Sequence, residues 1–383
     1  MDKPTVQDIF HRFYPAYLDQ YSPSPVQAKV AHNIMNCKTG AYGANVCVCE
    51  DCGFVQIHYN SCRNRCCPMC QAVPKEMWMD ARREDVLDAP YFHLVFTVPD
   101  ILNPVIYSNQ RLLYDALYHA ASSTISELTA DPKHLGAKVG YICILHTWGS
   151  EMNFHPHIHT ILLGGGLASN NQWRDNGENF FLPIRVISKM FRGKYLEELK
   201  RLWEEDKLVF QGTAEKFRNH YTFKELLDSC YGMDWIPHCK KTFNCAQTVI
   251  KYLGKYTHRI AVSNHRTVRM DDDTVTFLVK DYRNEGQWKE LTISGVEFVR
   301  RFLMHVPPRR FVRIRHYGLL CSRTKSQKLT LCRNLLGCKK YLSKLRDMEM
   351  PEILEHLYGI KVCVCKACGG HLGKPQMRMP LRC

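Results

Sequence analysis

Three histidines alternate with other residues in the segment HPHIHTILLGGG, which begins at His155. On a β-strand every second side chain points to the same face, so His157 and His159 would project together while Ile158 faces the core. His155 could continue the row, although Pro156 disturbs the strand there. Ordinary surface histidines are the alternative interpretation. Two neutral imidazoles with open coordination positions suit a divalent cation that polarises a phosphate oxygen.

Carboxylates, the usual ligands of a two-metal nuclease, are sparse around this segment. Glu151 is the only one close in sequence, which argues against a two-metal mechanism. The third ligand of a single cation stays open between His155, Glu151 and a residue distant in sequence.

Two tyrosines, Tyr252 and Tyr256, stand four residues apart in the segment VIKYLGKYTHRIAVSN. In a helix this spacing puts both on one face. Amphipathic tyrosines that merely pack with exposed hydroxyls would show the same spacing. A phenol has a pKa of about 10, so it attacks a phosphate only when that phosphate is polarised and positive charge is near. Basic residues and a histidine surround the pair: Lys251, Lys255, His258 and Arg259.

Cysteines gather at both ends of the chain. Cys49 and Cys52 form one CxxC pair, and Cys67 and Cys70 form a second after 14 intervening residues. Two such pairs can supply the four thiolates of a tetrahedral zinc site, which would be structural because no position is left for water. Free cysteines in a small core are the alternative. Four further residues could form a second site or replace ligands of the first: Cys47, His58, Cys62 and Cys66. A weaker candidate cluster lies near the C-terminus and contains Cys363, Cys365, Cys368, His371 and Cys383.

Composition points to a reducing compartment and a polyanionic partner. The chain of 383 residues carries a net charge of +15, and 19 of its residues are cysteine. It shows no apolar stretch long enough for a membrane span and no apolar core of a signal peptide near its start, so we expect a cytoplasmic protein. In that compartment, clustered cysteines bind metal more often than they form disulfides. Binding to a membrane surface would explain the charge but not the histidines or the cysteine pairs.

One region is strongly basic. Between Arg301 and Arg346 there are 13 Lys or Arg and no Asp or Glu. Such a block repels itself unless an anion neutralises it, although a solvated surface is the simpler alternative. Aromatic and apolar residues interrupt it, which favours a folded surface for nucleic acid. Arg313, Arg315 and Arg323 are the candidate phosphate contacts.

The elements that must position these residues follow from periodicity. We expect helices within 1–40 and over 74–87, 105–128, 186–208, 213–229 and 243–256, and strands over 91–99, 141–149, 157–165, 258–263, 274–280 and 288–293. Such an alternation is typical of an α+β fold with a mainly antiparallel sheet and flanking helices. We therefore predict three domains: 1–88, helical and zinc-binding; 89–300, which carries the histidines and tyrosines; and 301–383, basic, with a possible second zinc cluster.

Taken together, these residues resemble a known family, the two-tyrosine rolling-circle transposases of the insertion sequence ninety-one type, within the HUH endonuclease superfamily. The histidine motif is His157-Ile158-His159, SCRNRCCPMCQ at 61–71 resembles the family's zinc motif, and YLGKYTHRIAVSN at 252–264 its tyrosine motif. FVRIRHYGLL at 311–320 is also similar. The resemblance covers about residues 20–340 in the family's order.

The resemblance implies a role for each motif. His157 and His159, with His155 as the candidate third ligand, would hold catalytic Mg²⁺ or Mn²⁺. Tyr252 and Tyr256 would be the nucleophiles that form a 5′-phosphotyrosine and release a 3′-hydroxyl, in a basic setting that includes Lys255 and Arg259. Structural Zn²⁺ would be held by a set drawn from Cys49, Cys52, Cys62, Cys66, Cys67 and Cys70. Cys66 is a departure, because relatives more often have histidine there.

The implied partner is single-stranded DNA at the ends of a mobile element, bound near the bacterial nucleoid. No membrane and no small-molecule cofactor are expected, and the oligomeric state stays open. Two other functions compete with transposition. A replication initiator or mobilisation relaxase would use the same chemistry. A non-catalytic zinc-ribbon protein would bind nucleic acid with the histidines and tyrosines merely structural.

Overall fold

A computed structural model of the chain describes residues 3–176, 182–235, 237–243, 248–250, 254, 260–281, 286–374 and 376–378, and for 238–243 and 378 it describes the backbone.

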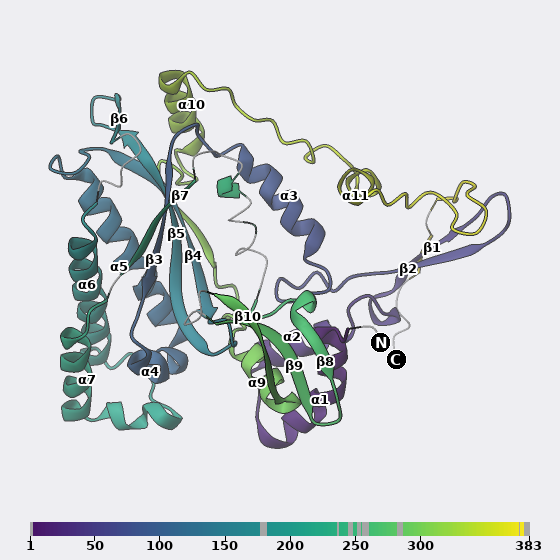
Figure 1. Cartoon of the computed structure of the whole chain (residues 1–383), viewed down its shortest axis with the longest axis horizontal. Helices are drawn as coiled ribbons and strands as arrows, with labels where there is room; N and C mark the ends of the chain where they lie inside the picture. Colours follow the sequence, from purple (N-terminus) through teal and green to yellow (C-terminus); the bar gives the residue numbers. More distant parts are fainter. Residues whose placement is uncertain are drawn as a thin grey trace.

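An antiparallel sheet forms the centre of the molecule (Figure 1). Its strands run in the order β11-β4-β5-β3-β7, and β6 pairs with one end of β5. β5 is the longest strand and pairs with β3 on one side and β4 on the other. The strands are β3 (Tyr91–Thr97), β4 (Lys138–Trp148), β5 (Phe154–Leu167), β6 (Trp173–Asp175), β7 (His238–Phe243) and β11 (Ile314–Gly318).

One face of this sheet is covered by helices. Phe92, Leu94 and Phe96 alternate along β3 and pack into a large apolar core with Ile158 of β5. The covering elements are η2 (Asp100–Leu102), α4 (Asn103–Ser108), α5 (Gln110–Ala130), α6 (Ile184–Glu204), η3 (Gly212–Arg218) and α7 (His220–Gly232). The residues between these apolar positions must therefore face the other side of the sheet.

The opposite face packs against α3 (Ala72–Arg83) and α10 (Lys325–Leu336). Val249 and Ile250 are buried in this second layer, close to Ile161 of β5. Gly254 is helical and lies so close to α3 that a β-carbon there would be 1.9 Å from the sulfur of Met79. Val249 and Ile250 therefore pack in the layer between the sheet and α3, and Gly254 packs against α3.

A second lobe joins the N-terminal helices to a later part of the chain (Figure 1). α1 (Val6–Gln20) and α2 (Pro25–Met35) begin with capping boxes at Thr5 and Ser24, which satisfy exposed N–H groups. Their apolar faces share one core with a small sheet and the helix that follows it. Those elements are η4 (Asn264–Arg266), β8 (Thr267–Met270), β9 (Thr274–Asp281), β10 (Gln287–Ser294) and α9 (Gly295–Met304).

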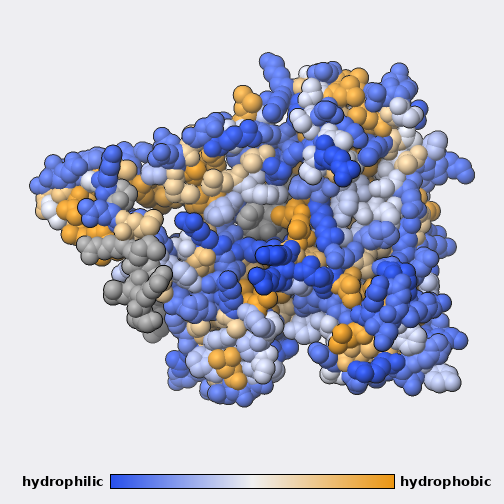
Figure 2. Space-filling view, turned by 180° about the vertical axis from the view of Figure 1, so that it is seen from behind, coloured by the Kyte–Doolittle hydropathy of each residue, from blue (hydrophilic) through white to orange (hydrophobic). Residues whose placement is uncertain are grey.

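The third unit is an arm at the right of Figure 1, in which an early hairpin lies beside the last described strand. η1 (Gly40–Tyr42) leads into the hairpin of β1 (Ala44–Val48) and β2 (Val55–Tyr59), and β12 (Gln376–Arg378) pairs with β1. α11 (Met350–Tyr358) lies on the connection that brings the chain back. Figure 2 shows hydrophobic side chains on the surface of this arm, in agreement with the half-exposed Val48, Val55 and Ile57.

The predicted α+β class and antiparallel sheet are confirmed. The strands expected over 91–99, 141–149 and 157–165 form its centre, and those over 274–280 and 288–293 form the small sheet. The strand expected over 258–263 is not found in its described part, which runs into η4 instead, and the helix expected over 243–256 is described only at 248–250 and 254. No helix among the described residues is both long and apolar enough to span a bilayer.

Each of the three segments that we expected to be a separate domain contributes helices or strands that pack with another of these segments. β11, from the segment 301–383, pairs with β4 inside the central sheet. Helices α1 and α2, from the segment 1–88, share a core with α9. The last strand, β12, returns to the N-terminal hairpin. Each unit of the fold is therefore assembled from parts that are distant in sequence.

Candidate functional site

Three imidazoles converge on the face of the central sheet that packs against α3. His157 and His159 alternate along β5, and His146 lies directly opposite His157 on the neighbouring strand β4. The Nε2 atoms of His157 and His159 are 3.0 Å apart, and one ring nitrogen from each of the three residues lies within 4.8 Å of the others. All three side chains are buried. This cluster, His146-His157-His159, is the histidine site.

Two imidazoles of the histidine site, those of His157 and His159, are held neutral by lowered pKa values. Burial, the nearby charge of His155 and, more weakly, that of His93 lower the pKa of His157 to about 3, although a hydrogen bond to the backbone of His155 acts in the opposite direction. Burial and then the neighbouring His146 and His157 lower the pKa of His159 well below its ordinary value. Neutral imidazole is the form that ligates a metal, so the protonation state matches that use at neutral pH.

Hydrogen bonds at Nδ1 orient the rings of His157 and His159. His157 Nδ1 lies 2.7 Å from the carbonyl oxygen of His155, to which it must donate its proton. His159 Nδ1 lies 2.9 Å from Nε2 of His93, on the adjacent strand β3. In His157 the lone pair on Nε2 is then directed at the site, and the ring of His159 is oriented by His93, as expected for ligands held by an outer partner.

His155 and Glu151, the expected candidates for the third ligand, lie outside the histidine site. Nδ1 of His155 lies 3.1 Å from Oδ1 of Asp100, and its side chain is one-third exposed. Glu151 is exposed, and its backbone carbonyl accepts a hydrogen bond from Arg301. His146 takes the third position. It lies in the strand predicted over 141–149, and only the register of β4 against β5 singles it out.

The structure describes residues next to the tyrosine pair but not the pair itself. Tyr252 and Tyr256 lie outside the described residues, as do Lys255 and Arg259. The adjoining Val249 and Ile250 are buried on the same face of the sheet as the histidines, since they pack with Ile161 and other residues of that face.

The cysteines form two clusters instead of the single site expected from the two CxxC pairs. Cys67 and Cys70 meet Cys37 and Cys62, with 3.8 Å between the sulfurs of Cys62 and Cys70. Cys49 and Cys52 meet a pair from the other end of the chain, Cys365 and Cys368. In each cluster the four sulfurs lie within 4.8 Å of one another. The β1–β2 hairpin carries the first pair away from the second, so the four cannot share one ion.

Cys66 belongs to neither cluster. Its thiol is buried, and burial raises its pKa although the charges of Arg313 and Arg65 act in the opposite direction. Cys37, which replaces it in the cluster, lies just after α2 and was not among the predicted ligands. No spacing rule pointed to Cys37, because it stands 25 residues before Cys62.

The three candidate arginines differ in exposure. Arg313 is buried, with its guanidinium 5.7 Å from the ring centre of Trp148, and Trp148 in turn stacks on His146. Arg315 forms an ion pair with Asp115 and lies over the ring of Tyr118. Only Arg323 is exposed. Arg313 therefore packs on Trp148, which in turn contacts the histidine site, and its buried side chain is not available at the surface for DNA.

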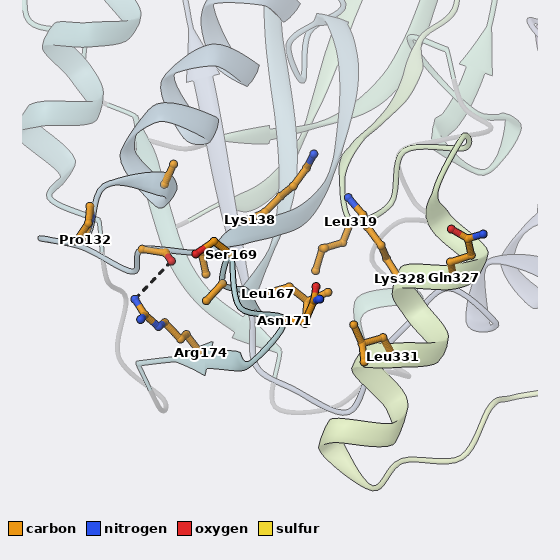
Figure 3. A pocket seen from close by; sticks show the side chains of 14 residues that line it. Pro132, Lys138, Leu167, Ser169, Asn171, Arg174, Leu319, Gln327, Lys328 and Leu331 are labelled. Carbon is orange, nitrogen blue, oxygen red and sulfur yellow. Dashed lines mark hydrogen bonds between the residues drawn. The ribbon is translucent and has the colours of Figure 1, made fainter.

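A separate open groove of about 750 Å³ lies at the opposite end of β5 (Figure 3). Lys138, Arg174 and Lys328 line it, and Arg174 donates a hydrogen bond of 3.5 Å to the carbonyl of Gly136. Burial and the neighbouring charge of Lys138 lower the pKa of Lys328. Leu167, which also lines it, is ten residues from His157 along the strand, so this groove is distinct from the histidine site.

Sequence comparison finds two family models in this chain. A model described as putative transposase matches residues 140–328, and a transposase zinc-binding domain of the insertion sequence ninety-one type matches residues 9–98. The putative transposase y4qJ of Sinorhizobium fredii is 40% identical over 369 residues, which cover 95% of this chain and 93% of that protein. The transposase for insertion sequence element IS801 of Pseudomonas savastanoi pv. phaseolicola is 27% identical over 318 residues, 79% of this chain and 72% of that one.

Among solved structures, partial likenesses occur to the conjugative relaxase TrwC in complex with oriT DNA. The metal-bound form is 13% identical, covers 43% of this chain and 70% of its own, and has a TM-score of 0.25. The copper-bound form is 14% identical, covers 67% and 96%, and has a TM-score of 0.26.

Proposed function

This chain belongs to the transposases of the insertion sequence ninety-one type, and from that premise we propose that it nicks and rejoins single-stranded DNA at the ends of a mobile element. The proposed intermediate is a 5′-phosphotyrosine, and the proposed process is rolling-circle transposition.

The observation that carries this proposal is the convergence of His146, His157 and His159 in a buried cluster, in which the lowered pKa values of His157 and His159 keep these two rings neutral. Three imidazoles on one side of an ion would leave its other positions for phosphate oxygens and water, which is the open coordination that the proposed Mg²⁺ or Mn²⁺ needs. Such an ion would polarise the scissile phosphate. The chain's own contribution is to hold three imidazoles close together on two paired strands.

Tyr252 and Tyr256 are the proposed nucleophiles. The phenol oxygen of one tyrosine bonds to phosphorus while the bond to the 3′ oxygen breaks; the phenol proton is lost and the departing 3′ oxygen takes one up. Because the phosphoester energy stays in the phosphotyrosine, rejoining needs no ATP. The neighbours Val249 and Ile250 support this role, since they are buried on the histidine face of the sheet. Lys255 and Arg259 are proposed to supply positive charge.

Zinc is proposed to be structural. The chain contains a transposase zinc-binding domain, and both cysteine clusters offer four thiolates, which leave no open position for catalysis.

The test is to mix the purified protein with end-labelled single-stranded DNA of an element terminus and Mn²⁺. We expect a covalent protein–DNA adduct that resists denaturation and is absent with EDTA, with Tyr252→Phe/Tyr256→Phe and with His157→Ala/His159→Ala. The matched control is Tyr221→Phe, which changes a tyrosine that is 76% exposed on α7 and should keep the adduct. An adduct of undiminished yield in the double tyrosine variant would refute the proposed nucleophiles, and DNA binding without any adduct would favour a non-catalytic binding protein.

A further inference from the structure

One cysteine cluster combines two segments that are distant in sequence: it contains Cys49, Cys52, Cys365 and Cys368. The matched zinc-binding domain ends at residue 98 and contains only the first two. We propose that these four thiolates bind one structural zinc ion that joins the two ends of the chain, so that the zinc-binding unit is completed only by the C-terminal segment.

The sulfur positions fit a tetrahedral ion. Cys49 Sγ lies 3.5 Å from Cys368 Sγ, and Cys52 Sγ lies 3.8 Å from Cys365 Sγ. Zinc–sulfur bonds of about 2.3 Å in a tetrahedron place the sulfurs about 3.8 Å apart. All four thiols are unpaired by disulfides, and Cys52 and Cys368 are exposed. In a reduced protein such a set of four soft ligands selects zinc or iron in tetrahedral geometry.

The two CxxC pairs have the same local structure. In each, the glycine after the second cysteine has a positive φ, +69° at Gly53 and +77° at Gly369, a conformation that other residues rarely adopt. Each glycine N–H donates a 3.0 Å hydrogen bond to the carbonyl of the first cysteine of its pair. The first cysteine of each pair also donates its N–H to a backbone carbonyl that follows the pair. Cys49 donates to the carbonyl of Phe54, and Cys365 donates to the carbonyl of Gly370. Two such turns facing each other are the arrangement that a zinc ribbon requires.

N–H groups are also directed at the sulfurs. The backbone N–H of Ala367 is 3.4 Å from Cys365 Sγ, and that of Gly370 is 3.4 Å from Cys368 Sγ. Such bonds stabilise the thiolate that a metal needs, as outer partners do at other metal sites.

This part of the arm has a small core. Among the described residues, this core consists of Cys47, Cys49, Cys365 and Leu372, which is too small to stabilise an independent unit. Backbone pairing joins the two ends: Cys49 bridges Leu372, and Gly373 donates a 2.9 Å hydrogen bond to Val48. A metal is the usual means by which so small a unit stays folded.

The test is the zinc content per chain of the full-length protein, measured by elemental mass spectrometry after a wash with weak chelator. Cys49→Ser/Cys52→Ser and Cys365→Ser/Cys368→Ser should each lose one equivalent of zinc, and the quadruple variant should also lose one. The control Cys321→Ser/Cys363→Ser removes two exposed cysteines that belong to no cluster and should keep the full zinc content.

The result that overturns the proposal is a full zinc content in Cys365→Ser/Cys368→Ser, a loss of two equivalents in the quadruple variant, or iron in place of that zinc. If a variant does not fold, thiol alkylation of the unmodified protein gives the same decision. The exposed Cys52 and Cys368 should resist alkylation until strong chelator is added, and then react together, whereas Cys321 should react at once. Early reaction of Cys368 would refute the site. None of these outcomes depends on nuclease activity.

Discussion

At the scale of single residues, the histidine site depends on partners that hold its rings. His93 lies on β3 and is hydrogen-bonded to His159 across the strands, while the carbonyl of His155 orients His157. These contacts orient the two rings, and a motif that contains only His157 and His159 does not reveal them.

We expect His93→Phe to weaken binding of Mn²⁺ about 10–100-fold, because the ring of His159 loses the partner that fixes its orientation. Isothermal titration calorimetry of the purified protein measures this. His119→Gln, a change of an exposed histidine on α5, should leave the affinity unchanged. Equal affinities for His93→Phe and the parent protein would remove His93 from the site.

Arg313 and Arg323 both lie in the basic segment FVRIRHYGLLCSR but differ in exposure, since Arg313 is buried and Arg323 is exposed. Arg323→Ala should weaken binding of single-stranded DNA and reduce its dependence on salt, because one counterion-releasing contact is lost. Arg313→Ala should instead lower thermal stability, because it removes a buried side chain beside Trp148. Fluorescence anisotropy across a salt series and a thermal melt distinguish the two effects. Normal stability of Arg313→Ala with weakened DNA binding would contradict this assignment.

At the scale of elements, α3 connects the sheet to the returning chain. On one side it packs against Gly254. On the other, the carboxylate of Asp80 accepts hydrogen bonds of 2.6 Å from both Tyr341 and Ser343 and of 3.0 Å from the N–H of Leu345. Burial alone would raise the pKa of Asp80, but these bonds outweigh it and lower the pKa. α3 is thereby held in place from both sides.

Asp80→Asn should lower the free energy of unfolding by about 1–3 kcal/mol, since an amide cannot accept all three hydrogen bonds and leaves a buried donor unsatisfied. Urea denaturation measures the change. Asp88→Asn alters an exposed carboxylate five residues beyond the end of α3 and should be neutral. A loss of the same size in both variants would mean that the hydrogen bonds of Asp80 are not the cause.

α9 carries an acid-sensitive contact. Glu297 binds Arg300 at 2.6 Å and Arg301 at 2.7 Å, and these hydrogen bonds, against the opposing effect of burial, lower its pKa from 4.5 to about 2. Because the folded pKa is depressed, the stabilisation is complete above pH 4.5 and is lost as the pH falls toward 2. Glu297→Gln should therefore be less stable than the parent at pH 7, with the gap closing over that interval.

Chemical denaturation at several pH values tests this behaviour. Glu290→Gln, which breaks an exposed ion pair with Arg269, serves as the control and should show a small gap at every pH. A constant gap for Glu297→Gln down to pH 2 would exclude titration of Glu297 as the origin.

At the scale of the whole molecule, the two cysteine clusters occupy different structural settings. Cys37 and Cys67 are buried in the core shared by α1, α2 and α9, and Cys62 and Cys70 pack against it. The other cluster sits at the arm, beside a core of four residues. Metal loss should therefore have unequal consequences.

Cys67→Ser should unfold the second lobe, because the free energy of zinc binding, about 10–16 kcal/mol, is comparable with the whole stability of a domain. Cys365→Ser/Cys368→Ser should leave the main thermal transition of the body almost unchanged. Hydrogen exchange measured by mass spectrometry locates each effect. Loss of protection in α1 and α9 in the second variant would contradict the separation of the two settings.

Local patterns were enough to predict what depends on near neighbours in sequence. The alternation along β3, β4 and β5 predicted the central strands, and the same period put His157 and His159 on one face. Charge, cysteine spacing and the order of motifs led to the family, which the relatives confirm. Such features can be recognised from the sequence because each depends on residues within a short stretch of the chain.

Only the tertiary structure decided which distant residues meet. His146 joins the histidine site through the register of β4 against β5, and Cys37 and the pair at Cys365 and Cys368 complete the clusters across long stretches of chain. A CxxC pair supplies two ligands wherever it lies, and its spacing carries no information about which other pair the fold brings to it. Packing of the whole chain fixes that choice, since a metal binds where four donors arrive together.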